Sequence, residues 1–162
     1  MLTDNMSVPQ LYVRAPFGYI SLLTTNDFVI KIDYCAHEKV LHARPNKLSI
    51  EVCKQINAYL IDPSFTFDLP LDIQGTNYRK RVWDQIAQIP VGETRTYGQI
   101  ATFIKSSARA VGGACGDNPV PLLIACHRVV AQKGIGGFMH STGSFALKVK
   151  YWLINHEANA GR

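Results

Sequence analysis

The spacing of apolar positions changes along the chain from short strand-like runs to helical repeats. Residues 11–35 hold apolar runs broken by a Thr-Asn-Asp turn at 25–27, a pattern typical of hairpin-joined strands. After Pro45 the apolar positions recur at helical spacing until Asp62, which predicts a helix there. These positions are Leu48, Val52, Ile56, Tyr59 and Leu60. Residues 65–75 are rich in turn formers, and we expect them to connect two lobes.

The second half of the chain is predicted to be mostly helical. The expected helices start at the candidate N-caps Thr76, Thr96, Ser106 or Ser107, and Ser144. The first would turn Val82, Ile86 and Ile89 to one face and end at Pro90. The second and third are joined by a tight turn, which predicts a helix-turn-helix. The apolar run 120–130 is expected to be a buried strand-like segment. The last helix is expected to turn Phe145, Val149, Trp152, Leu153 and His156 inward.

The third of these helices, from Ala108 to about Cys115, consists almost entirely of small residues. Gly112 and Gly113 each cost up to about 1 kcal/mol relative to Ala in a helix, so helix propensity does not explain them. Two explanations remain open. One is close packing against a neighbouring element. The other is a smooth face that enters a narrow groove, with Arg109 projecting from it.

Composition and charge narrow the class of protein. The chain has 162 residues, 47% hydrophobic and 18% charged, which suits one domain or two small lobes and excludes disorder. Apolar runs of about 20 residues and a secretory leader are absent from the sequence, so we expect an intracellular protein without a membrane span. Residues 1–75 carry 6 Lys/Arg against 8 Asp/Glu, whereas residues 76–162 carry 11 against 4. The basic second half indicates either a nucleic-acid partner or a solvated basic surface.

The cysteines indicate chemistry at only one position. Cys35, Cys53, Cys115 and Cys126 form no C-x-x-C pair, and Cys35, His37 and His42 lack regular ligand spacing, so neither disulfides nor a metal are expected. Cys126 alone would be an inert buried thiol. However, His127 is adjacent and Glu157 follows on the last helix. A carboxylate that orients an imidazole, which deprotonates a thiol, is the usual way to activate such a nucleophile.

Several motifs in one order support a family resemblance. NPVPLLIACHRVV, FTFDLPLDIQGT, VWDQIAQIPVGETRTYGQIA, ARAVGGACGDNPVP and YWLINHE resemble the 6-O-alkylguanine-DNA alkyltransferases, nearly continuously over residues 65–162. The front half resembles the family's small ribonuclease-H-like lobe more loosely. The resemblance implies an α/β (α+β) fold. A sheet lobe would span residues 1–72, and a mostly helical DNA-binding and alkyl-acceptor domain would span residues 73–162.

The resemblance also implies roles for individual residues. Cys126 would accept the alkyl group, His127 would take its proton through a water, and Glu157 would orient His127. Asn118 would pin the turn before the active-site segment, and Lys150 would lie near the alkylated oxygen. Tyr97 would lie near the guanine and the adjacent phosphate and donate a proton to the departing base. The implied DNA contacts are Arg109, Thr96, Arg95, Ala108, Ala110, Gly112 and Gly113, and the implied pocket residues are Val129, Phe138 and Met139.

The implied activity is DNA repair in a single turnover. The protein would bind duplex DNA through the minor groove without sequence specificity, flip 6-O-methylguanine out of the helix and alkylate itself. Whether 4-O-methylthymine is also accepted stays open. The resemblance implies a monomer without cofactor or metal. We expect it in the cytoplasm, or in the nucleus if the source is eukaryotic.

Three features depart from the family pattern. Ala125 replaces the usual proline before the cysteine, and the connection from Tyr97 to Arg109 is about two residues shorter. Phe138 and Met139 replace a tyrosine and a small residue, and about five extra residues precede the last helix. A lesion-binding protein of the same fold without transfer activity is therefore an alternative. A cysteine hydrolase using Cys126 and His127 is a second one, although no motif identifies an oxyanion hole.

Overall fold

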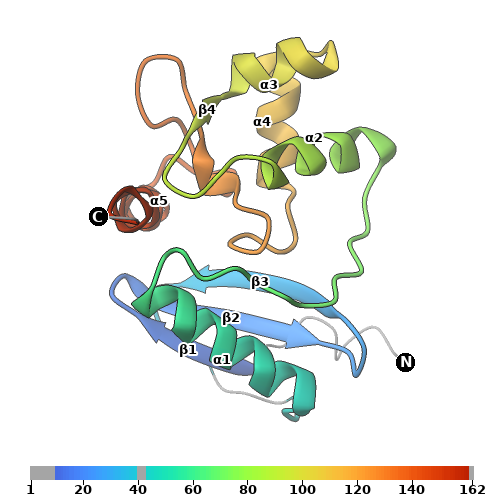
Figure 1. Ribbon diagram of the computed structural model, residues 1–162, viewed down its shortest axis with the longest axis vertical. Helices are drawn as coiled ribbons and strands as arrows, with labels where there is room; N and C mark the ends of the chain where they lie inside the picture. Colours follow the sequence, from blue (N-terminus) through green and yellow to red (C-terminus); the bar gives the residue numbers. More distant parts are fainter. Residues whose placement is uncertain (1–9, 40–42, 161–162) are drawn as a thin grey trace. The chain divides into compact units, whose positions relative to one another are not determined.

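The computed structural model describes residues 10–39 and 43–160. The chain divides into two compact units, Met1–Ile73 and Gln74–Arg162, which we call the N-terminal and C-terminal units (Figure 1). Among the described residues, no helix combines the length and the apolar character needed to cross a bilayer.

The N-terminal unit is a three-stranded antiparallel sheet with one helix packed against it (Figure 1). Its strands are β1 (Leu11–Ala15), β2 (Gly18–Thr24) and β3 (Val29–Cys35), in that order across the sheet. The turn predicted at 25–27 joins β2 to β3, and a second tight turn joins β1 to β2. The strands and the turn predicted from the sequence are therefore confirmed.

The helix of this unit is α1 (Lys47–Ile61), as the apolar spacing predicts. Asn46 caps it, because its side chain accepts a hydrogen bond from the Ser49 N–H while the Ser49 hydroxyl accepts one from the Asn46 N–H. The beginning of the expected connector belongs to this unit, since the Val29 N–H donates to the Pro70 carbonyl at 2.8 Å. Cys35 and His37 lie in this unit, and His42 falls outside the described residues.

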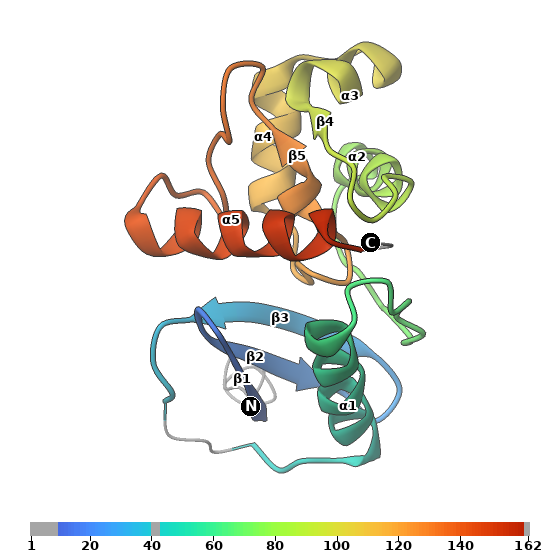
Figure 2. The same ribbon diagram turned by 60° about the vertical axis from the view of Figure 1, so that its left-hand side comes forward.

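The C-terminal unit is built from helices around a short two-stranded parallel sheet (Figure 2). Its helices are α2 (Asn77–Ala87), α3 (Tyr97–Ile104), α4 (Ala108–Gly116) and α5 (Ser144–Ala158). The strands β4 (Arg95–Thr96) and β5 (Val129–Val130) pair in parallel, and the 3₁₀ helix η1 (Cys126–Arg128) leads into β5. Thr76, Thr96 and Ser107 each accept a hydrogen bond from the backbone two or three residues into the next helix, so these predicted caps are confirmed.

The core of the C-terminal unit lies where α2, α3 and α4 meet. The indole N–H of Trp83 donates to the Ala114 carbonyl at 2.9 Å and ties α2 to α4. The fully or nearly buried apolar residues here are Val82, Trp83, Ile86, Ile89, Ile100, Ile104, Val111 and Val120. Phe103, on the same short helix as Ile100, is 72% exposed and does not join this core.

The strand expected over residues 120–130 is wrong. Turns occupy most of this segment, η1 follows them, and only Val129 and Val130 are extended in a sheet. A short apolar run has the same composition whether it forms a buried strand or a buried turn, so its sequence does not separate the two. As a consequence Cys126 and His127 lie in a helical turn and not on opposite sides of a strand.

Two expectations about the last helix are also wrong. Gly143 is the N-cap residue of α5 and Ser144 is its first helical residue, without a side-chain cap. Val149 and Leu153 are buried as predicted, but Phe145, Trp152 and His156 are partly exposed. Lys150 and Glu157 are buried in their place. The inward face of α5 therefore carries two ionisable side chains, which a search for apolar spacing passes over.

Candidate active site

Cys126 lies at the wall of a cavity of about 310 Å³ within the C-terminal unit. One face of α4 lines this cavity with Gly112, Cys115 and Gly116, and Tyr97 at the start of α3 faces them. The loop 137–142 before α5 contributes the rest of the wall, including Phe138 and Met139. Only 4% of Cys126 is exposed, so its sulfur is shielded from bulk water.

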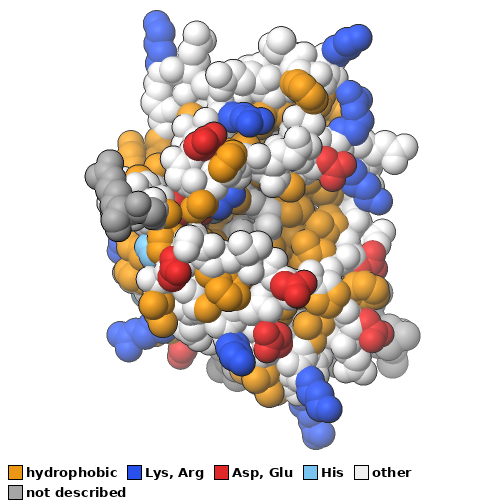
Figure 3. All heavy atoms as spheres, viewed as in Figure 1, with side chains coloured by type: hydrophobic (Ala, Val, Ile, Leu, Met, Phe, Trp, Pro, Cys, Tyr) orange, Lys and Arg blue, Asp and Glu red, His pale blue; other side chains and the backbone are white. Residues whose placement is uncertain are grey.

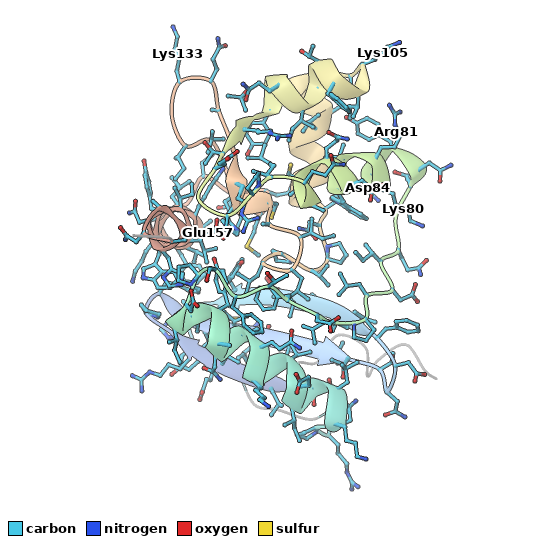
Figure 4. The ribbon with its side chains drawn as sticks, in the orientation of Figure 1. Lys80, Arg81, Asp84, Lys105, Lys133 and Glu157 are labelled. Atoms are coloured by element: carbon cyan, nitrogen blue, oxygen red, sulfur yellow. The ribbon has the colours of Figure 1, made fainter. Side chains whose placement is uncertain are left out.

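His127, Glu157 and Arg128 form a buried network next to this cysteine. The Nε2 atom of His127 lies 2.7 Å from Oε1 of Glu157, and both side chains are almost completely buried. Arg128 donates from Nε to Oε2 of Glu157 at 2.8 Å and from Nη2 to Oε1 at 3.0 Å. A third bond, from Nη1 to the Ile89 carbonyl at 2.7 Å, fixes the guanidinium (Figure 4 shows Glu157 on α5). This bidentate arrangement holds the carboxylate in one orientation.

The charges of this network define the histidine tautomer. Burial alone would raise the pKa of Glu157, but the hydrogen bonds from His127 and Arg128 lower the pKa well below its ordinary value. Burial lowers the pKa of His127, so its imidazole is neutral near pH 7. The Nε2 atom must then carry the proton, because it donates to an ionised carboxylate. The lone pair stays on Nδ1, which is buried and has no hydrogen-bond partner among the described residues.

The thiol of Cys126 is protonated at rest. Burial raises its pKa to about 11, although a hydrogen bond with Asn118 and the charge of Lys150 act in the opposite direction. A thiolate therefore forms only when a base removes the proton during the reaction. The neutral imidazole of His127 provides such a base on the adjacent residue.

Asn118 shapes the chain just before the cysteine. Its Nδ2 donates to the Ile124 carbonyl at 2.9 Å and its Oδ1 accepts from the Val120 N–H at 3.0 Å, which closes the turn. Ala125 has φ −77° and ψ 62°, and the Cys126 N–H donates to the Ile124 carbonyl at 2.8 Å. These values describe an inverse γ-turn. Its φ is one that proline adopts, so Ala125 keeps the backbone conformation that a proline would impose.

Lys150 is fully buried and supports the loop that lines the cavity. Its Nζ donates to the carbonyls of Ile135 at 2.7 Å and Gly137 at 2.8 Å, and it lies 3.4 Å from the Tyr97 hydroxyl. Burial lowers the pKa of this amine to about 8. The Tyr97 hydroxyl also donates to the Gly137 carbonyl at 3.2 Å, and burial raises its pKa to about 12. Although Lys150 lies on a helix whose neighbouring residues Lys148 and Tyr151 are exposed, its own side chain points into the unit.

The residues expected to contact DNA lie on the outside of the unit. Ala108, Arg109 and Ala110 are exposed in the first turn of α4, and Arg95 and Thr96 are half-buried in β4. A Cβ at Gly113 would meet no atom within 4 Å, and one at Gly112 would lie 3.9 Å from the Tyr97 ring. Close packing therefore does not explain these two glycines. In Figure 3, Lys and Arg side chains project over α2, α3 and the loop after β5, where Figure 4 labels Lys133.

The structure brings most, but not all, of the predicted pocket residues together. Val129 is completely buried in β5, and the lining of the cavity does not include it. The sequence analysis missed Arg128 as a partner of Glu157, and it missed Cys115, Gly116 and His140 in the cavity wall. In the sequence, only the position of Arg128 two residues after Cys126 could have indicated that it belongs to the site.

Comparison with known proteins agrees with this geometry. Residues 77–159, about half of the chain, match the DNA-binding domain of 6-O-methylguanine DNA methyltransferase. The chain belongs to this methyltransferase family. A methylated-DNA–protein-cysteine methyltransferase of Metallosphaera sedula is 35% identical over 76% of this chain and 80% of its own length.

Two further comparisons show how much of the chain is similar to known family members. A probable methylated-DNA–protein-cysteine methyltransferase of Acanthamoeba polyphaga mimivirus is 42% identical over 56% of this chain, which spans 58% of that protein's length. The crystal structure of a Mycobacterium tuberculosis family member in complex with DNA superposes with a TM-score of 0.73 at 31% identity. That alignment covers 91% of each chain, so the mixed α/β fold of this family member extends over both units.

Proposed function

We propose that this protein repairs alkylated DNA by moving the alkyl group from the O6 atom of 6-O-methylguanine to the sulfur of Cys126. The observation that carries the proposal is the buried series of Glu157, His127 and the adjacent Cys126, whose cysteine lines a cavity of about 310 Å³. Family membership supports the same activity, because the relatives that match are named as methylated-DNA–protein-cysteine methyltransferases.

The proposed reaction follows from the protonation states at rest. His127 accepts the thiol proton at Nδ1, through a water, while Glu157 stabilises the imidazolium that forms. The sulfur attacks the alkyl carbon, a C–S bond forms, and the C–O bond breaks with its electron pair left on the guanine. Tyr97 keeps its proton at neutral pH, because burial raises its pKa to about 12, and it donates that proton to the departing base. The product is a thioether, which is no leaving group, so each molecule reacts once.

DNA binding is proposed for the pair α3 and α4, read as a helix-turn-helix. Exposed Ala108 and Ala110 with the glycines of α4 give a narrow helix suited to the minor groove, and Arg109 would fill the gap left by the flipped base. The contacts would involve phosphates without base readout, so binding would lack sequence specificity and weaken steeply with salt. The DNA complex of the M. tuberculosis family member supports DNA as the partner. The protein would act as a monomer.

Intact-protein mass spectrometry tests the proposal directly. After incubation with a duplex containing one 6-O-methylguanine, we expect a stoichiometric gain of one methyl group, mapped to the Cys126 peptide. Cys126→Ser should stay unmodified, whereas Cys115→Ser, the matched control in the same cavity, should still be methylated. A protein that binds the lesion duplex without gaining mass would instead be a lesion-binding protein.

The role of Arg109 has a separate test. Arg109→Ala is expected to slow methyl transfer from duplex DNA by about ten-fold or more, because the side chain no longer replaces the flipped base in the stack. Transfer from the free base should change little, since no stack is present. Lys148→Ala, which removes an exposed cation from α5, is the control for net charge. Equal losses with duplex and free base would contradict the stacking role.

A further inference from the structure

The loop in front of α5 makes an unusual turn beside the cavity. Phe138 and Ser141 exchange two backbone hydrogen bonds, of 2.8 and 2.9 Å, and the two residues between them are Met139 at φ 53° and His140 at φ 56°. A two-residue hairpin with both central residues in the left-handed region is a type I′ turn, which favours Asn and Gly. Met is disfavoured there, and His, although it adopts this region more often than most side chains, is not among the residues that usually form such a turn. Contacts outside the turn must therefore stabilise it.

The imidazole of His140 supplies such a contact. Its Nε2 atom lies 2.8 Å from Oδ1 of Asp117, the residue that ends α4. The other carboxylate oxygen of Asp117, Oδ2, forms an ion pair with Nη2 of Arg79 on α2, at a distance of 2.8 Å. We call these three side chains the Asp117 latch. It joins the loop to two helices of the C-terminal unit through a single carboxylate, whose pKa the His140 and Arg79 contacts lower.

Gly116 provides the space in which the ring of His140 sits. A Cβ built on Gly116 would come within 2.6 Å of three atoms of this imidazole, far inside van der Waals contact. The histidine ring thus packs directly on the backbone of α4. Only glycine at position 116 allows this approach without moving the ring.

One member of the latch, His140, lies in the wall of the cavity that Cys126 also lines. His140, Gly116 and Met139 all line the same cavity as Cys126. At about 310 Å³ this cavity is at the lower end of the range for small-molecule sites. The position of the 138–141 turn therefore sets how much room an alkyl group has next to the sulfur.

We propose that His140 is a positioning residue that determines alkyl-group specificity. Through the Asp117 latch it holds the 138–141 turn against the end of α4 and restricts the cavity to small alkyl groups. This inference rests on the proposed function for its substrate, but the latch itself is a property of the free protein.

Three variants separate the latch from the fold of the loop. His140→Gly removes the imidazole and relieves the left-handed strain, so the turn itself is retained. His140→Gln keeps a donor at a similar reach toward Asp117 and should restore the latch. Gly116→Ala leaves the histidine in place but displaces its ring. His37→Ala, which removes an exposed histidine of the N-terminal unit, is the control.

The readout is the ratio of single-turnover rates for 6-O-methylguanine and 6-O-benzylguanine in otherwise identical duplexes. Because both substrates meet the same nucleophile, changes in the reactivity of Cys126 cancel in this ratio. We expect His140→Gly and Gly116→Ala to lower the methyl preference by about three- to five-fold, the effect of losing a half-exposed charged contact. His140→Gln and His37→Ala should keep the wild-type ratio. An unchanged ratio in His140→Gly would overturn the proposal.

Hydrogen exchange of the free protein distinguishes failure of this inference from failure of the proposed function. In His140→Gly the amides of Phe138 and Ser141 should exchange about ten-fold faster than in the wild type, and in His140→Gln at the wild-type rate. If the wild type transfers no alkyl group at all, the proposed function is wrong. The exchange rates then test by themselves whether the Asp117 latch holds the 138–141 turn. Wild-type exchange in His140→Gly would mean that no latch holds the turn.

Discussion

At the scale of single residues, Glu157 is the side chain that joins His127 and Arg128 in one network. One carboxylate, 2% exposed, accepts hydrogen bonds from both His127 and Arg128. Taking such a charge out of water is costly unless it is fully paired, and here both partners come from η1 while Glu157 lies on α5. The orientation of His127, the proposed general base, therefore depends on Glu157, a residue of α5 that is 30 positions away in sequence.

We predict that Glu157→Gln slows methyl transfer by about 100-fold, the range of a misplaced general base. An amide can accept from Arg128 or His127, but it carries no charge to stabilise the imidazolium. The measurement is the single-turnover rate of methyl transfer to Cys126, followed by mass. Glu93→Gln, a change at an exposed glutamate of the same unit, should leave the rate unaltered. A rate within two-fold of wild type for Glu157→Gln would remove this role.

Ala125 allows a second prediction at this scale. Its φ of −77° suits proline, and its N–H donates to no other residue among those described. Ala125→Pro should therefore raise the free energy of unfolding by about 0.5 kcal/mol, through a less flexible unfolded chain. Urea unfolding measures the change. A clear loss of stability would show that the turn needs a conformation that proline does not allow.

At the scale of elements, the helices of the C-terminal unit begin where the local sequence predicts. Thr76, Thr96 and Ser107 are each followed by a helix, because the cap bond closes within three residues and needs no distant partner. Ser144 is also of a residue type that often caps helices, but the N-cap residue of α5 lies one position earlier, at Gly143. Residue type alone therefore locates a helix start to within a residue or so.

Two caps give a matched pair of variants. Ser107→Ala removes the cap of α4, the proposed DNA-entering helix, and Thr76→Ala removes the cap of α2. Each should lower the free energy of unfolding by about 1 kcal/mol. Only Ser107→Ala should also weaken duplex binding, because its loss loosens the first turn that carries Arg109. Thermal unfolding and fluorescence anisotropy with labelled duplex measure the two effects. Equal affinities for both variants would count against α4 as the DNA contact.

At the scale of the whole molecule, the cavity gathers groups whose protons are coupled to folding. Burial raises the pKa of Cys115 to about 12 and that of Cys126 to about 11, from an ordinary value near 9. Burial lowers the pKa of Lys150 from 10.5 to about 8. Folding therefore keeps two thiols neutral and makes one amine easier to deprotonate.

These shifts predict how stability depends on alkaline pH. Above pH 9 the unfolded chain loses thiol protons that the folded chain retains, so each thiol lowers stability by about 1.4 kcal/mol per pH unit. Between about pH 8 and 10.5 Lys150 acts in the opposite direction with the same slope, because the folded amine is already neutral. Burial also raises the pKa of the Cys53 thiol, which adds to the loss. The wild type should thus lose stability between pH 9 and 10.5, and Cys115→Ala should lose stability less steeply, because one thiol with a raised pKa is gone. Urea unfolding across this pH range measures the slopes of both proteins. Parallel curves for the wild type and Cys115→Ala would contradict a raised pKa of Cys115.

Local sequence patterns predicted most of the helices and strands and indicated the residues of the proposed active site. Strands, helices and caps depend on neighbours a few residues apart, and the motifs around Cys126 and His127 are contiguous. The tertiary structure alone decided what surrounds those groups. It showed that η1 replaces a strand, that Lys150 is buried, that Arg128 shares Glu157, and that His140 reaches Asp117. Such contacts join residues 13 to 53 positions apart, and burial and pKa depend on the atoms that folding brings close.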